Sequence, residues 1–212
     1  MNTRMLAAAM VAVAATPAMA QEVRGTRTSD VMIGLSGIGV LPTNGGNTSI
    51  GGSPNANDAY TAQLDVTFFV TPHLALNLIA ATTKHDVEVR GVPGAGTLVL
   101  GSLWLLPPTL TVQYYPWRAA RLSPYFGAGL NYTVFFDESG SRSPGIRSVD
   151  VEDAWGFALN AGVNFEITRN WLANLDVKYI FLAPDVRVNG GAVTGTAELN
   201  PWVIGAGVRY RF

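Results

Sequence analysis

The strongest constraint on the fold of this chain is a two-residue alternation of its side chains. From Trp202 to Phe212 every second residue is apolar, and the residues between them are valine, glycine and arginine. A period of two is that of a β-strand, whose successive side chains point to opposite faces. Large apolar residues on one face and small or charged residues on the other are typical of a strand with lipid outside and a narrow lumen inside.

Seven earlier segments repeat this alternation, so the sequence predicts eight strands. The seven are residues 30–41, 59–71, 74–85, 98–115, 123–136, 155–167 and 171–181. Each is about ten residues or longer, as a tilted membrane-spanning strand requires. The connections alternate between short turns and long loops, with the long loops at Pro42–Asp58, Glu88–Gly96, Asp137–Val151 and Pro184–Gly195.

An even number of strands with alternating short and long connections is the pattern of outer-membrane barrels. A closed barrel also leaves no unpaired sheet edge in lipid, where each unsatisfied backbone group would be costly. We therefore predict an all-β fold, an eight-stranded antiparallel transmembrane β-barrel with short periplasmic turns and four longer extracellular loops. The alternative is a soluble barrel with its faces reversed, whose exterior would carry too few charges for a surface in water.

Two predicted strands depart from regular alternation. In the first strand, Ile38 and Val40 are out of phase with the apolar residues before them, which predicts a β-bulge near Gly37 or Gly39. In the fourth, Pro107 and Pro108 cannot both sit in a regular ladder because proline has no backbone donor, so they predict a break or bulge.

Composition narrows the possible partners. Charged residues make up 14% of the chain, the net charge is -1 and the mean hydropathy is +0.22. No internal stretch reaches the roughly 18 apolar residues of a spanning helix. The absence of a basic cluster argues against nucleic acid as a partner, and the absence of cysteine excludes disulfides and thiolate chemistry. We expect outer-membrane lipid as the main partner.

The N-terminus has the form of a secretory signal. Arg4 supplies a positive charge, an apolar core follows, and Ala18-Met19-Ala20 matches an A-x-A cleavage site. We predict a signal peptide at residues 1–20, with the barrel domain at residues 21–212 and the protein exported to the outer membrane.

The predicted inward faces gather charges in the periplasmic half of the barrel. Charges in a narrow lumen must pair, because an isolated buried charge is costly. One hypothesis is a plug that closes the lumen to ions; the simpler interpretation is that these charges only fill and stabilise it. The residues are Asp65, Glu166, Asp176, Lys178, Arg209 and Arg211.

Apolar residues are expected on the inward face above these charges. Phe69, Ile79, Leu172 and Ile180 could form a passage for apolar solutes, or could simply pack the barrel. The Pro107-Pro108 break is a candidate lateral opening in the wall, with a closed bulge as the alternative.

Aromatic residues are expected in two girdles where the barrel meets the membrane interfaces. Tyr114, Trp117, Trp171, Tyr210 and Phe212 are predicted near the periplasmic ends of the strands. Tyr60, Phe136, Trp155, Phe181 and Trp202 are predicted near the outer ends.

We predict no enzymatic activity, no cofactor and no metal site. The chain has two histidines, His73 in a turn and His85 beside Asp86 at a loop edge. An acid–base site needs several groups within hydrogen-bond reach, and no nucleophile motif accompanies this pair.

The second half of the chain resembles the outer membrane protein W family of small porin-like barrels. The likeness covers most of residues 30–212 and is weak in the loops. It is carried by Leu106-Pro-Pro-Thr-Leu110, Gln113-Tyr-Tyr115, Pro124-Tyr-Phe-Gly-Ala-Gly-Leu-Asn-Tyr-Thr133, Phe135-Phe136, Trp155-Gly156, Ala161-Gly-Val163, Asn174, Asp176-Val177, Tyr179, Asn200-Pro-Trp-Val-Ile204 and Tyr210-Arg-Phe212.

The resemblance implies a narrow, partly hydrophobic channel that passes small hydrophobic molecules and releases them sideways into the membrane. It also implies that Tyr210 and Phe212 form an assembly signal for the barrel-insertion machinery. The alternative function is a non-conducting structural, adhesive or receptor barrel of the envelope, which would use its long loops.

Overall fold

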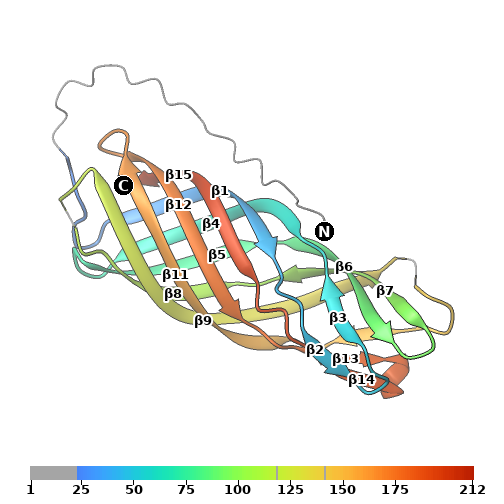
Figure 1. Ribbon diagram of the computed structural model, residues 1–212. Coiled ribbons are helices and arrows are strands. Elements are labelled where there is room, and N and C mark those ends of the chain that lie inside the picture. The colour runs from blue at the N-terminus through green and yellow to red at the C-terminus, as the bar shows by residue number, and fades with distance from the viewer. Residues whose placement is uncertain (1–22, 118, 141) are drawn as a thin grey trace, which may run out of the picture.

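Eight antiparallel strands close into a barrel in this computed structural model, which describes residues 23–117, 119–140 and 142–212 (Figure 1). Around the barrel, each of these strands pairs with the one that follows it in the chain, and the last pairs with the first. The strands are β1 (Val31–Leu41), β4 (Ala59–Phe69), β5 (Leu74–Ala81), β8 (Thr109–Tyr114), β9 (Leu122–Ser139), β11 (Ala154–Glu166), β12 (Trp171–Phe181) and β15 (Trp202–Arg211).

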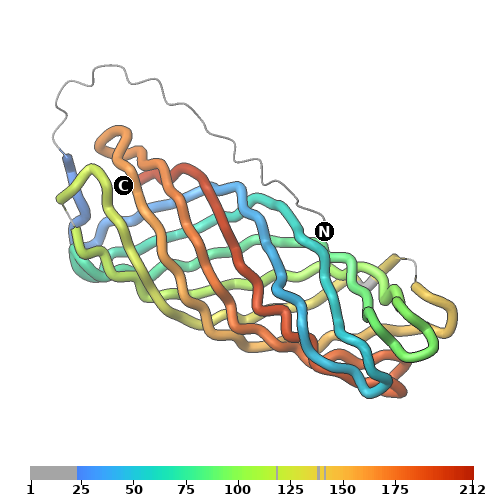
Figure 2. The backbone as a smooth tube through the Cα atoms, in the orientation of Figure 1, coloured from blue at the N-terminus to red at the C-terminus, as the bar shows by residue number. Residues whose placement is uncertain are grey.

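The two ends of the barrel differ. Short turns join the strands at one end, which we call the turn end, where the C-terminus also lies (Figure 1). The opposite end, which we call the loop end, carries the long connections, which Figure 2 shows extending well beyond the barrel. The predicted signal peptide, residues 1–20, lies outside the described residues.

The four predicted loops contain strands of their own, which corrects the expectation of irregular segments. A second sheet of four strands forms at the loop end in the order β10-β13-β14-β2, while β3, β6 and β7 continue the barrel wall. These elements are β2 (Gly46–Thr48), β3 (Ser53–Ala56), β6 (Thr83–Val92), β7 (Gly96–Leu106), β10 (Val149–Val151), β13 (Asp185–Val188), β14 (Val193–Ala197) and the 3₁₀ turn η1 (Asn189–Gly191).

The segment Glu88–Gly96 shows why the loop prediction was wrong. Pro93 and Gly94 lie in a tight turn, where the Ala95 N–H donates to the Val92 carbonyl at 3.1 Å, while Gly91 lies within β6 and Gly96 begins β7. Gly94 has φ 76°, a left-handed conformation that glycine adopts without strain. On either side of this turn, β6 and β7 pair as a hairpin, and Val89 and Val92 are buried.

The predicted bulge in β1 is absent. β1 pairs without a register shift with both β15 and β4, including at Gly37 and Gly39. Ile38 and Val40 are inward and buried, whereas Ile33 and Leu35 face outward. The apparent slip in phase arises because the inner wall becomes apolar toward the loop end, while the outward positions between these residues are the glycines Gly37 and Gly39.

The outward face of the barrel is apolar, as predicted. Leu64, Leu130 and Leu175 are each about 60% exposed, while Arg209 and Arg211 inside are about 1% exposed. Rings cluster at both ends, with Trp171 and Tyr210 centroids 5.1 Å apart at the turn end and Tyr179 and Trp202 centroids 4.8 Å apart toward the loop end. None of the helical structure in the described residues is long and apolar enough to cross a membrane.

Candidate channel

The six predicted inward charges form three buried ion pairs. Arg209 Nε lies 3.0 Å from Asp65 Oδ1, Arg211 Nη2 lies 2.8 Å from Glu166 Oε2, and Lys178 pairs with Asp176. Each of these side chains is at most 7% exposed. The structure therefore brings all six together in the lumen, although their proposed role in excluding ions stays a prediction.

Neutral hydrogen-bonding groups complete this layer. The Tyr125 hydroxyl donates to Asp176 at 2.7 Å, and Asn174 donates to Tyr125 at 3.0 Å and to Asn164 at 2.9 Å. Arg209 Nη1 donates to the same Asn164 oxygen at 3.1 Å. Buried charges are tolerated when such bonds satisfy them. Tyr125 was not among the predicted lumen residues, although its place beside the outward Phe126 assigns it to the lumen.

A second layer fills the lumen from the level of the ion pairs to the turn end, since Leu172 lies opposite Glu166 and Arg209 in the ladders and Met32 lies opposite Arg211. It is an apolar cluster, which we call the aromatic layer, made of Met32, Phe69, Ala75, Tyr115, Tyr125 and Leu172. Phe69 and Leu172 were predicted above the charges, and this was wrong. β4 runs toward the turn end, so Phe69 follows Asp65, and Leu172 precedes Asp176 on a strand that runs the other way.

The segment before β1 lies across the turn end and was not anticipated as part of the barrel. The Arg24 N–H donates to Glu166 at 2.9 Å, and the Arg24 guanidinium donates to the Phe212 carbonyl at 2.7 Å. Arg211 in turn donates to the Gly25 carbonyl at 2.7 Å. This segment therefore forms a third closure of the lumen, after the ion pairs and the aromatic layer.

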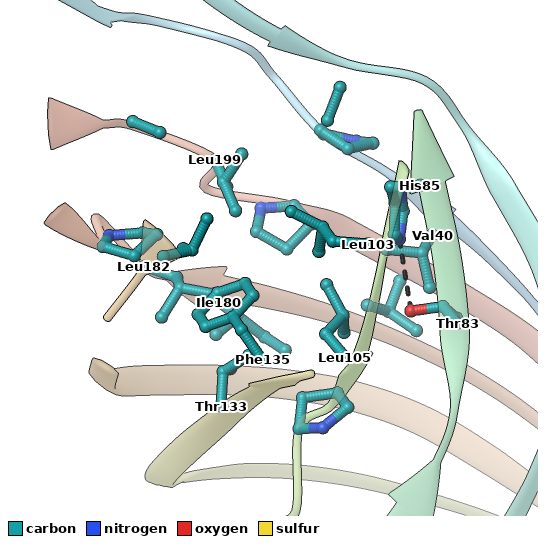
Figure 3. A pocket seen from close by; sticks show the side chains of 18 of the residues that line it. Val40, Thr83, His85, Leu103, Leu105, Thr133, Phe135, Ile180, Leu182 and Leu199 are labelled. Carbon is teal, nitrogen blue, oxygen red and sulfur yellow. Dashed lines mark hydrogen bonds between the residues drawn. The ribbon is translucent and has the colours of Figure 1, made fainter. Parts of the chain in front are cut away.

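Above the ion pairs the lumen is an apolar shaft (Figure 3). Ile79 and Ile180 line it, as expected of an apolar passage. Its four polar lining residues are Gln63, Thr83, His85 and Thr133. The remaining lining residues are Ile38, Val40, Pro42, Ala56, Ala81, Val87, Leu103, Leu105, Pro107, Phe135, Val151, Leu182, Pro184, Val186, Ala197, Leu199, Pro201 and Val203.

The shaft continues into an outer chamber between β6–β7 and the second sheet. Val87, Val151, Val186 and Ala197 line both spaces, so the two spaces adjoin, and we refer to them together as the apolar path. The chamber is lined in addition by apolar residues that include Ile50, Val89, Leu98, Leu100, Val149, Val188 and Val193. The strands missed in the loop predictions thus extend the apolar interior well beyond the barrel.

His85 is a structural residue of this path. One ring nitrogen is 2.7 Å from the Asn57 carbonyl and the other is 3.2 Å from the Thr83 hydroxyl. Burial lowers the pKa of the imidazole, so the ring stays neutral at neutral pH. Asp86 is exposed on the opposite face of β6. The two side chains therefore form no acid–base pair, and no acidic or histidine cluster suited to a metal occurs in the described residues.

The barrel wall is interrupted where β7 gives way to β8. Pro107 and Pro108 separate these strands as predicted, and the Asn131 amide reaches both proline carbonyls at 3.3 and 3.4 Å. The wall at the prolines is thus braced by a side chain.

A larger interruption lies on the other side of β5. The β4–β5 ladder ends at the pair Gln63↔Ala81, and pairing resumes beyond it between β3 and β6 at Ala56↔Val87, where the Asn57 N–H also donates to the Asp86 carbonyl at 3.2 Å. The outer part of β4, residues 59–62, has no partner on that side among the described strands. This gap in the ladder, which we call the seam, lies beside the shaft.

Comparison with known proteins agrees with this architecture. A model of the OmpW family matches residues 29–212. The uncharacterised outer-membrane protein y4mB of Sinorhizobium fredii is 37% identical over 199 residues, covering 87% of this chain and 84% of that protein. Outer membrane protein W of Escherichia coli is 32% identical over 182 residues, covering 82% and 84%. The crystal structure of OprG from Pseudomonas aeruginosa aligns with a TM-score of 0.82 at 25% identity, covering 90% of this chain and 99% of that one.

These matches confirm the predicted resemblance, the barrel class and the outer-membrane location. The family match spans every barrel strand, and the apolar outward face is accordingly the lipid-facing one. The chain therefore belongs to the OmpW family of outer-membrane β-barrel proteins.

Proposed function

We propose that this barrel takes small apolar molecules from the extracellular side into the outer membrane. The observation that carries the proposal is the apolar path of adjoining outer chamber and shaft, which ends at the three buried ion pairs, here called the charged floor. An apolar solute gains about 25 cal/mol for each Å² of surface removed from water. The lining residues of the shaft include no carboxylate, lysine or arginine, so ions gain nothing comparable there.

The floor argues for a sideways exit. A straight route to the periplasmic side would have to separate buried ion pairs, each costing about 3–5 kcal/mol to break. It would also have to displace the aromatic layer and the segment containing Arg24. At the seam, by contrast, no backbone ladder joins the outer part of β4 to β6. The solute would leave the shaft there and enter the lipid.

A tryptophan at Ile180 is expected to block this path. Ile180 is 3% exposed and packs with Ile38, Val203 and other residues of the shaft wall, so a larger side chain must project into a narrow space. Uptake of radiolabelled naphthalene would be measured in intact Gram-negative cells that lack related barrels and express the wild type or Ile180→Trp. We expect the variant to fall to the rate of cells without the protein.

The matched control is Leu175→Trp, on the same strand but facing lipid with 59% exposure. It adds a similar volume outside the barrel and should leave uptake at the wild-type rate. Folded barrel in the outer membrane would be quantified for each variant by the heat-dependent mobility shift on gels. Equal uptake by the wild type and by cells without the protein would refute the proposal.

A further inference from the structure

Gln63 is an anomaly within the apolar shaft. Its side chain is 3% exposed and lines the shaft. Its Oε1 atom has no hydrogen-bond partner. Buried polar atoms are nearly always paired in proteins, so an unpaired one in a functional cavity calls for an explanation.

The other polar groups of the shaft already have partners. Thr83 and His85 contact each other at 3.2 Å, and His85 also reaches the Asn57 carbonyl. The Thr133 hydroxyl donates to Asn131 at 2.8 Å. Gln63 is therefore the lining residue of the shaft, within the described chain, whose terminal oxygen remains unpaired.

The position of Gln63 relates it to the proposed path. It belongs to the last pair of the β4–β5 ladder, directly below the seam. The next inward residue of β4 toward the turn end is Asp65, which belongs to the charged floor. A solute that moves down the shaft thus meets the Gln63 amide at the base of the apolar section, before it turns toward the lipid.

We propose that Gln63 is a specificity-determining residue that hydrogen-bonds the polar group of an apolar solute carrying one hydroxyl. The inference rests on the proposed function and names its substrate class. A carboxamide offers both an acceptor oxygen and donor hydrogens, and a hydroxyl can use either. A carboxylate is disfavoured, since the shaft has no cationic lining residue to compensate its desolvation.

The test compares 1-naphthol with naphthalene, two solutes with the same ring system that differ by one hydroxyl. Initial uptake rates would be measured in the same cells, with the rates of cells lacking the protein subtracted. In Gln63→Leu, the naphthol-to-naphthalene ratio should fall about two- to tenfold, the range for one net hydrogen bond. The naphthalene rate itself should stay the same or rise. Gln113→Leu makes the same chemical change at a residue that does not line the shaft, and it should leave the ratio unchanged.

A second measurement reports on binding directly and uses the wild-type chain. In isotope-labelled protein in lipid nanodiscs, the side-chain amide resonances of Gln63 should shift more when 1-naphthol is added than when naphthalene is added, because naphthalene acts on them only through its ring currents. An unchanged ratio in Gln63→Leu, or equal losses of both rates, would overturn the inference while leaving the proposed function intact. If no solute entered faster than in cells without the protein, the proposed function would fail. In that case the amide resonances decide the inference, and equal shifts with 1-naphthol and naphthalene would overturn it.

Discussion

Replacing Arg209 by alanine is expected to lower the free energy of unfolding of the barrel by about 3–5 kcal/mol, the usual cost of leaving one member of a buried ion pair without its partner. Arg209 and Asp65 are each about 1% exposed, and their charged atoms are 3.0 Å apart. The guanidinium also donates to Asn164 and lies 5.4 Å from the centre of the Tyr125 ring. The loss would be measured by urea titration of protein in phospholipid vesicles, followed by tryptophan fluorescence.

Two comparisons identify the cause of this loss. Lys84→Ala removes the same charge from an exposed side chain of β6 and should change the unfolding free energy by no more than about 0.5 kcal/mol. The double variant Asp65→Ala, Arg209→Ala leaves no unpaired charge at this site, so it should cost clearly less than the two single losses added together. Additive losses would contradict the assignment of Arg209 and Asp65 as a coupled pair.

The barrel could be predicted from sequence because lipid favours apolar residues along the outer face of every strand. In β15 and at Phe212 directly after it, apolar residues occupy each outward position whatever faces the lumen. The strands at the loop end obey no such rule. Those of the second sheet have three to five residues each, and some pair with distant segments, as in Gly195↔Thr48 between β14 and β2. The glycine, proline and asparagine residues around these strands therefore made the segments look like loops in the sequence.

The lumen could be predicted only in part, for two physical reasons. Alternation assigned the charged residues to the inside, but partners across a closed barrel depend on the stagger of the strands. Arg209 and Arg211 lie on the same face of one strand, yet Arg211 pairs with Glu166 and Arg209 pairs with Asp65 on a different strand. The inner face also changes from polar to apolar along each strand. Ile38 and Val40 were therefore interpreted as displaced by a bulge, when they belong to the shaft.

The charged floor requires a residue without a side chain at Gly34. This glycine lies on β1 opposite Arg209 of β15 on one side and Asp65 of β4 on the other, so this ion pair passes directly over it. A Cβ atom at Gly34 would collide with the Asp65 carboxylate and would lie 2.9 Å from Arg209 Cγ. Gly34→Ala should therefore destabilise the barrel by about 1–3 kcal/mol, as overpacking does, and toward the upper end because the displaced atoms are charged.

The neighbouring Gly37 supplies a matched control for this prediction. It is on the same strand but faces outward, and a Cβ atom there would meet no other atom within 4 Å. Gly37→Ala should be neutral or stabilising by about 0.5–1 kcal/mol, because alanine has less backbone freedom to lose on folding than glycine. Both variants would be unfolded in urea in the same vesicles as Arg209→Ala. Similar stabilities for the two alanine variants would mean that the ion pair can shift aside without cost, and the close approach of Gly34 to Asp65 and Arg209 would then not limit the stability of the floor.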